Sequence, residues 1–375
     1  MTDPTGPLGS RLTDDAQAIA RTATIDLGLG YPQLAHPPWL RHLLVAGVDP
    51  ALAYSSSSSW SAAADAALDA ALLEAACRCL GVDEHHAANG LVTFSGSVAL
   101  DRVLASQLGV GGSVVITSPS VDMVSAMISE HPGVQAVCVP TTGPGFHLDV
   151  DAVAASLLAD TRSIVITSPD NPSGNIVVAD QMHALVTLAM EHDVTLVVDQ
   201  CFALINPHGI DIPALAEFAT PGLRWVMLWD TGKTFGLNHE KLGFVFCSPE
   251  VLPGIRERLN VLQYDVSRRQ KLLFRAVLDQ AHANRWFDEL STTVAANLEL
   301  VHQASLDVPL VASSPDAGSL TLLDVTEVAE GMTGSVFAGV LLADKGVGVI
   351  RAADFFHPLA PSGVRQPEHD HFVRV

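Results

Sequence analysis

Three polar residues follow short apolar runs of this sequence, and their types suggest a single site. Asn171 in the segment Asn-Pro-Ser-Gly, Asp199 and Lys233 each come just after a run of four or five mostly apolar residues. In α/β proteins, ligands bind at the carboxyl ends of the sheet strands, where such residues would be placed. A carboxylate and an amine at neighbouring strand ends therefore indicate a binding site with covalent or acid–base chemistry.

The segment Gly232-Lys233-Thr234 also resembles part of a phosphate-binding P-loop, and its spacing tests this alternative. The P-loop motif needs a glycine five residues before its Gly-Lys pair. That position is Met227. Without the glycine, the loop cannot surround a diphosphate with successive backbone N–H groups, so a P-loop is excluded.

A Schiff-base lysine accounts for the whole set. A lysine can hold pyridoxal 5′-phosphate (PLP) as an imine, while a buried carboxylate keeps the pyridine nitrogen protonated and the ring electron-withdrawing. The phosphate needs hydrogen-bond donors, which Ser95, Gly96 and Ser97 can supply from a turn that leads into a helix. The sequence therefore predicts PLP as cofactor and an amino acid as substrate.

These residues need a scaffold of alternating strands and helices. Short apolar runs rich in β-branched residues are typical of buried parallel strands. The runs are Ser113–Thr117, Ala136–Val139, Ser163–Thr167, Thr195–Val198, Trp225–Leu228 and Phe244–Cys247. Stretches such as Ala179–His192, with apolar residues at helical spacing, lie between them, and a further helix is expected at Ala62–Leu80. The alternation predicts an α/β fold with a mostly parallel, doubly wound sheet.

The pattern changes after the last of these runs. A long helical stretch near Arg268–Leu300 precedes strand-like pieces at Ser319–Leu323 and Gly348–Ile350. We expect a second, smaller α+β domain here. The expected parts are an N-terminal arm (1–40), a large PLP-binding domain (41–265), and a bridging helix with the small C-terminal domain (266–375).

The composition limits which binding partners and which cellular compartment are expected. The 375 residues are 48% hydrophobic, and 41 acidic against 20 basic residues give a formal charge of −21. Such a charge repels phosphate backbones and anionic lipid, so neither nucleic acid nor a membrane surface is an expected partner. Met1–Ser10 lacks the basic start and apolar run of a secretion signal. These features predict a cytoplasmic protein.

The cysteines do not indicate a metal site. They are five in number, and Cys77 and Cys79 are separated by a single residue, which is the wrong spacing for a zinc knuckle. Ordinary buried thiols are the expected role, and no metal is predicted.

On these residues the chain resembles the fold-type I PLP enzymes of the aspartate aminotransferase superfamily (class I/II), from about Ile25 to the C-terminus. Thr93–Leu100 is similar to the phosphate turn of that family. Asn171 matches the asparagine that contacts the 3-oxygen of the cofactor and the substrate carboxylate. Asp199 matches the partner of the pyridine nitrogen, and Lys233 matches the Schiff-base lysine.

The resemblance continues toward the C-terminus. Lys241 lies eight residues after Lys233, where family members usually carry a phosphate-binding arginine. The segment Phe372–Val375 is similar to the closing strand of the family, whose arginine, here Arg374, binds the substrate carboxylate bidentately.

Further roles follow from the same resemblance. His357 and His371 lie near this arginine in the sequence and are candidates for substrate binding or proton transfer, as is His239 after the lysine. The family also implies a homodimer, in which Tyr54 would reach the phosphate bound by the partner subunit.

Three positions depart from the family pattern. Phe202 stands where aminotransferases usually have a tyrosine that bonds the 3-oxygen, and Val121 stands where an aromatic ring usually stacks on the cofactor. Asp230 replaces the phosphate-binding serine. An acid there would repel the phosphate unless Lys241 or Thr231 compensates.

Phe202, the Asp-Thr-Gly-Lys segment and Lys241 together resemble a smaller branch of the superfamily. It contains PLP-dependent arginine oxidases and capreomycidine-synthase-like cyclases of bacterial natural-product pathways. The segment Phe355-Phe356-His357 is also similar to this branch.

Three functions remain open at this point. The resemblance to the smaller branch implies a reaction through an external aldimine and a quinonoid that is not simple transamination, with O2 as a possible electron acceptor. The second function is an ordinary class I/II aminotransferase. The third is a PLP-binding regulatory domain without turnover, against which the lysine, the aspartate and the arginine all argue.

Overall fold

The centre of the molecule is a seven-stranded sheet with the order β2-β8-β7-β6-β5-β3-β4. The computed structural model describes residues 16, 18–28, 30, 34–48, 62–109, 111–263, 265–357 and 370–375. The strands of this sheet are β2 (Gly90–Thr93), β3 (Gly112–Ser118), β4 (Val134–Pro140), β5 (Thr161–Thr167), β6 (Thr195–Asp199), β7 (Trp225–Asp230) and β8 (Gly243–Cys247). From β4 to β7 all neighbours are parallel. This confirms the predicted mostly parallel α/β sheet.

Strand β8 is the exception. It pairs antiparallel with β7 and with β2, so the expectation of a parallel strand at Phe244–Cys247 was wrong. The connection from β7 to β8 contains only the five-residue helix α9 (Thr231–Phe235). Such a short helix cannot carry the chain back along the sheet, as a parallel crossover requires.

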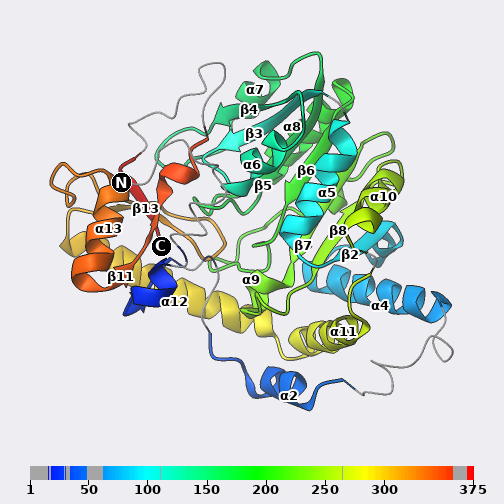
Figure 1. The fold of residues 1–375 in the computed structure, drawn as a ribbon, viewed down its shortest axis with the longest axis horizontal. Coiled ribbons are helices and arrows are strands. Elements are labelled where there is room, and N and C mark those ends of the chain that lie inside the picture. The colour runs from blue at the N-terminus through cyan, green and yellow to red at the C-terminus, as the bar shows by residue number, and fades with distance from the viewer. Residues whose placement is uncertain are drawn as a thin grey trace.

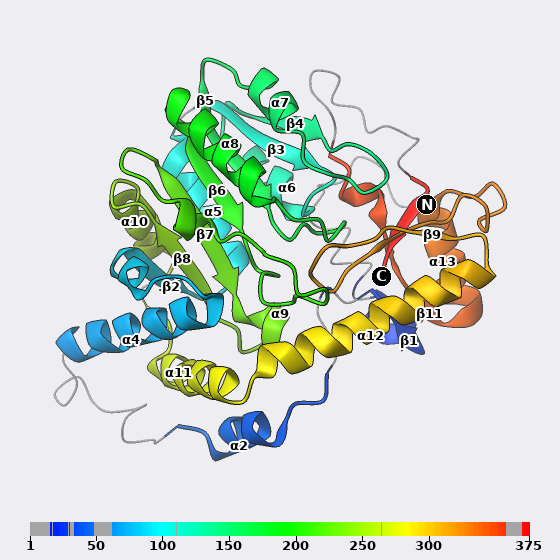
Figure 2. The same ribbon diagram turned by 180° about the vertical axis from the view of Figure 1, so that it is seen from behind.

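Both faces of the sheet are buried under helices (Figures 1 and 2). Alternate residues of β3 pack into different clusters: Val114 and Ile116 join one cluster, and Val115 joins the other. The first face is covered by α5 (Gly96–Leu108), α6 (Met123–Ser129) and α10 (Leu252–Leu262). The second is covered by α4 (Ala62–Leu80), α7 (Val150–Ala155), α8 (Ala179–Glu191) and α11 (Arg268–Ala283), with α2 (Pro38–Ala46) packed outside α11.

A smaller part follows in the C-terminal region. Its four-stranded antiparallel sheet has the order β12-β13-β10-β9 and is accompanied by helix α13 (Gly334–Lys345). The strands are β9 (Val311–Ala312), β10 (Leu322–Asp324), β12 (Ile350–Arg351) and β13 (Phe372–Arg374). Strand β1 (Ile25–Asp26) pairs in parallel with β11 (Val347–Gly348), so the N-terminal segment lies against this part. The smaller C-terminal domain is thereby confirmed, and the division of the chain after residues 40 and 265 stays a prediction.

The long helical stretch expected near Arg268–Leu300 is two helices. Helix α11 ends at Ala283, Arg285 adopts a left-handed conformation (φ 53°), and α12 (Trp286–Asp307) then runs toward the four-stranded sheet (Figure 2). The Trp286 indole N–H donates to the carbonyl of Thr234 at 3.0 Å. The bridging helix is therefore fixed to α9, the helix that carries Lys233.

No helix in the described part of the chain is long and apolar enough to cross a membrane.

Candidate active site

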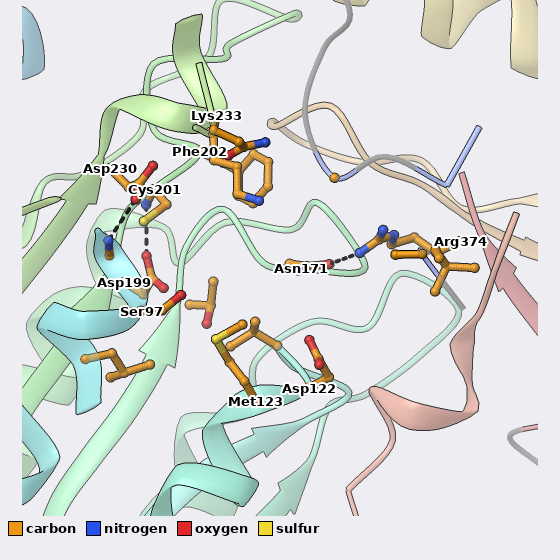
Figure 3. Close-up of a pocket in the computed structure, with 18 of the residues that line it drawn as sticks. Ser97, Asp122, Met123, Asn171, Asp199, Cys201, Phe202, Asp230, Lys233 and Arg374 are labelled. Carbon is orange, nitrogen blue, oxygen red and sulfur yellow. Dashed lines mark hydrogen bonds between the residues drawn. The ribbon is translucent and has the colours of Figure 1, made fainter. Parts of the chain in front are cut away.

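A cavity of about 680 Å³ lies at the carboxyl ends of the parallel strands, beside the C-terminal part. Asp199 is the last residue of β6, Asp230 is the last residue of β7, and both line the cavity. In Figure 3, Asp230, Cys201, Asp199 and Ser97 lie toward one end, and Asn171 and Arg374 lie toward the other. The cavity therefore has two chemically distinct ends.

Lys233 is placed between these ends by the short helix α9. The helix begins after Asp230, whose side chain caps it, and ends at Gly236, which has a left-handed conformation (φ 63°) that glycine adopts readily. The Lys233 Nζ lies 5.5 Å from the centre of the Phe202 ring. Burial lowers the pKa of Lys233, and this raises the fraction of neutral, nucleophilic amine.

One end of the cavity is formed by the start of helix α5. The Ser95 hydroxyl accepts a hydrogen bond from Val98 N at 3.2 Å and so caps the helix. Gly96 and Ser97 follow in the first turn and line the cavity together with Lys241. A helix N-terminus with a nearby lysine is suited to hold a phosphate.

Asp199 lines the cavity near Cys201 and Asp230. Its Oδ1 accepts a hydrogen bond from Cys201 N at 3.0 Å. Burial raises the pKa of Asp199, although the hydrogen bonds from Cys201 act in the opposite direction. A protonated ring nitrogen beside this carboxyl would restore its ionised form.

The other end of the cavity is built around Arg374, which is only 6% exposed. Its Nη1 donates to Asn171 Oδ1 at 3.2 Å, and its Nη2 donates to the carbonyl of Gly28 at 2.7 Å. Among the described residues, its buried Nε has no hydrogen-bond partner. Burial lowers the pKa of Arg374 to about 10, so the guanidinium stays charged at neutral pH. It therefore offers a positive charge to an anionic group in the cavity.

The structure brings most of the predicted site residues together. Those that line the cavity are Gly96, Ser97, Asn171, Asp199, Phe202, Lys233, Lys241 and Arg374. The three departures from the family pattern, at positions 121, 202 and 230, line it as well. These positions agree with the predicted roles, which the geometry alone does not test.

Other predicted residues lie elsewhere. Ser95, Thr231 and His357 are buried outside the lining of the cavity. The Thr231 hydroxyl exchanges hydrogen bonds with the main chain of Leu242, and the carbonyl of His357 accepts from Ser118 Oγ. Their proposed contacts with cofactor or substrate remain predictions. Tyr54 lies outside the described residues.

Sequence reasoning missed several residues of the cavity wall. Asp122, Met123 and Asn238 line it, as do Ala16, Ala20 and Gly28 from the N-terminal segment. Asp122 and Met123 directly follow Val121, which was assigned to the cofactor ring by resemblance, so the neighbouring loop was the available signal.

Asp170, next to Asn171, gives a prediction on stability. Its Oδ2 accepts from Ser173 N at 3.2 Å and Ser173 Oγ at 2.7 Å, and burial raises its pKa to about 7. Between the unfolded value of 3.8 and about 7, the folded state binds more protons, so this carboxyl's contribution to stability falls as pH rises. Asp170→Asn removes the titration and keeps an acceptor oxygen. Its free energy of unfolding relative to the wild type should therefore rise between pH 5 and pH 8, by at most roughly 3 kcal/mol.

Denaturant unfolding at the two pH values measures this difference. Asp151→Asn, at an exposed carboxylate of α7, is the matched control and should show a much smaller change with pH. An Asp170→Asn difference that stays constant from pH 5 to pH 8 would contradict the assignment.

The residues present fit PLP. The first turn of α5 packs this close to β6 and β7 because position 96 is glycine: a Cβ there would lie 3.0 Å from Cys201 Sγ and 3.2 Å from Asp230 Cβ. Ser97 and Lys241 would face the phosphate, Asp199 the ring nitrogen, and Lys233 the aldehyde carbon. The donor set thus matches the charges along the cofactor.

Comparisons with known proteins agree with this site. The family model described as aminotransferase class I and II matches residues 24–364. The protein named "Probable N-succinyldiaminopimelate aminotransferase DapC" of Mycobacterium tuberculosis is 27% identical over 262 residues, which cover 69% of this chain and 64% of that protein. An aspartate aminotransferase of Musicola paradisiaca is 28% identical over 248 residues, which cover 64% of this chain and 58% of that protein.

Solved structures support the fold across nearly the whole chain. The N-succinyldiaminopimelate aminotransferase of M. tuberculosis superposes with a TM-score of 0.82 at 20% identity, over 99% of this chain and 94% of that one. YbdL of Escherichia coli, described as having a methionine aminotransferase function, gives 0.80 at 20% identity, over 100% of this chain and 95% of that one. By the family match, this chain belongs to the class I and II aminotransferases, whose members use PLP.

Proposed function

We propose that this protein is an aminotransferase that uses PLP to move the amino group of an α-amino acid. The observation that carries the proposal is the arrangement of the Lys233 amine and the Arg374 guanidinium around Gly30. A Cβ placed on Gly30 would lie 3.5 Å from Lys233 Nζ and 3.7 Å from Arg374 Nη2. The amine and the guanidinium thus face one small space, and an α-amino acid carries its nitrogen and its carboxylate on one carbon.

The arginine end orients the substrate. The charged Arg374 guanidinium attracts the carboxylate, while Asn171 and the Gly28 carbonyl hold the guanidinium in place. The amino group of the substrate then points toward Lys233. This fixes the substrate Cα within reach of the lysine amine.

Lys233 then has two tasks. Its amine, whose neutral form burial favours, would hold the cofactor through its aldehyde carbon. Once released by the substrate, it would accept the proton from Cα and donate it to that former aldehyde carbon. When bound, PLP supplies the electron sink that makes this proton acidic. Asp199 stabilises the positive charge on the ring nitrogen that this role requires.

Phe202 favours a second candidate function. Its ring, 3% exposed, lies near Lys233 and offers no hydroxyl to the 3-oxygen of a bound cofactor. Without that partner the proton balance of a bound cofactor would differ, and the site would be suited to a reaction with O2 or to loss of a leaving group from the substrate. The related proteins described above are named as aminotransferases, so they give this oxidase, deaminase or cyclase-type reaction no support.

One experiment separates the two candidates. Purified protein with PLP is incubated with a panel of L-amino acids, with and without 2-oxoglutarate or pyruvate, in air and without oxygen. An aminotransferase should convert the 2-oxo acid to its amino acid in a 1:1 ratio with substrate loss, at equal rates with and without oxygen. Oxygen consumption coupled to substrate loss, with no new amino acid, would instead establish the oxidase.

The homodimer, the cytoplasmic location and the absence of nucleic-acid partners remain part of this proposal. The net charge of −21 supports the last of these.

A further inference from the structure

The phosphate end of the cavity already contains a carboxylate. Asp230 is 3% exposed, and its Oδ2 accepts a hydrogen bond from Gly96 N at 2.7 Å. Gly96 is the first residue of the 13-residue helix α5. The N–H groups in such a first turn are those that bind an anionic ligand. Asp230 therefore uses a donor that a phosphate would otherwise take (Figure 3).

The side chain is held firmly in this position. Its Oδ1 accepts from Gly232 N at 2.6 Å, so one carboxylate joins the starts of α5 and α9. A Cβ on Gly232 would lie 2.6 Å from Asn238 Oδ1, 2.8 Å from Asp230 Oδ1 and 2.9 Å from Lys241 Cδ. Asp230, Asn238 and Lys241 thus converge around Gly232 and leave little room for the carboxylate to move aside.

The charges at this end oppose one another. Lys241 is the only lysine or arginine among the described residues lining this end, and Asp230 is an acid beside it. A phosphate monoester, with a charge of about −1.5 to −2 at neutral pH, would bind near Lys241 but also near the Asp230 carboxylate. In a partly desolvated cavity this repulsion is felt more strongly than in water.

We propose that Asp230 determines how strongly this site selects the phosphate of its cofactor. By occupying the Gly96 N–H with a negative charge, it weakens binding of the phosphate group while leaving the aldehyde and ring contacts intact. The bond of Lys233 to the cofactor and the Asp199 contact then contribute a larger share of cofactor affinity. The inference concerns cofactor recognition and is independent of which reaction follows.

Binding of PLP and of pyridoxal, which lacks the phosphate, tests the proposal. Both are titrated by absorbance into protein freed of cofactor, for the wild type, Asp230→Asn and Asp230→Ser. The ratio of the pyridoxal Kd to the PLP Kd should rise at least about tenfold in both variants, mainly through tighter PLP binding. An unchanged or smaller ratio in folded variants would overturn the proposal. The role of Asp230 would then be to connect the starts of α5 and α9 by its hydrogen bonds.

Two further measurements complete the test. Asp122→Asn removes a carboxylate of the same cavity that interacts electrostatically with Arg374, at the other end, and its ratio should stay within about twofold of the wild type. If neither Asp230 variant folds, the ratio of the pyridoxal Kd to the PLP Kd in the wild type tests the proposal. A ratio above about a thousandfold, the factor that two unopposed charge-assisted hydrogen bonds supply, would contradict a weakened phosphate site.

Discussion

Lys233→Ala should abolish the yellow absorption of protein-bound PLP and reduce turnover by at least about four orders of magnitude. The covalent attachment and the proton transfer at Cα both depend on this one amine, so no remaining group can replace it. Within the described cavity wall the other lysine, Lys241, lies at the phosphate end. The absorption spectrum of PLP-soaked, dialysed protein, together with single-turnover rates, measures both effects.

Lys345 provides the control, because it is also a lysine and does not line the cavity. Lys345 ends helix α13 and is exposed, so Lys345→Ala should keep both the absorption and the turnover. Circular dichroism is used to check that the Lys233→Ala protein is folded. A folded Lys233→Ala protein that retains the yellow band would show that another residue bonds the cofactor, and the assignment of the site would fail.

Arg374→Lys should raise the KM of the best amino-acid substrate by about a hundredfold and change kcat much less. A lysine keeps the charge but has a single point of contact, so it cannot hold Asn171 and Gly28 while also binding a carboxylate. Truncation of a buried, hydrogen-bonded charge partner typically costs about 2–5 kcal/mol. Because the substrate carboxylate is held equally before and during the reaction, the loss should fall on KM.

Steady-state kinetics with an amino acid and with the matching amine, which lacks the carboxylate, make this prediction specific. The variant should lose its preference for the amino acid, while the weak reaction of the amine stays unchanged. Arg258→Lys, at an exposed position of α10, serves as the control. An unaltered preference in Arg374→Lys would mean that the carboxylate binds elsewhere.

The positions of strand ends allow much of this site to be predicted from the amino-acid sequence. Asp199 and Lys233 can be paired on sequence alone, because apolar runs of β-branched residues locate the strands that precede them. Helix α4 has the bounds that its sequence predicts, Ala62–Leu80. Short periodic segments with clear ends are the features that sequence patterns reveal best.

A strand, a helix break and a long-range hydrogen bond were not predicted from the sequence, and each omission has a physical explanation. Strand β2 (Gly90–Thr93) begins with glycine and contains only two apolar residues, Leu91 and Val92, so no apolar run marks it. The break between α11 and α12 depends on the left-handed conformation of Arg285, which no residue preference signals. The hydrogen bond from Gly96 to Asp230 joins residues 134 positions apart, and such long-range contacts are not encoded in local pattern.

The contacts of Arg374 connect three segments that are distant along the chain. Its guanidinium joins Gly28 of the N-terminal segment and Asn171 of the large sheet to strand β13, across 346 and 203 positions of sequence. An anion bound at this guanidinium would stabilise all three attachments at once, since ligand binding adds to the stability of every contact it requires. Substrate binding and the local order of the N-terminal segment are therefore thermodynamically coupled. A change that disrupts the contact of this segment with Arg374 also lowers the affinity for the substrate carboxylate.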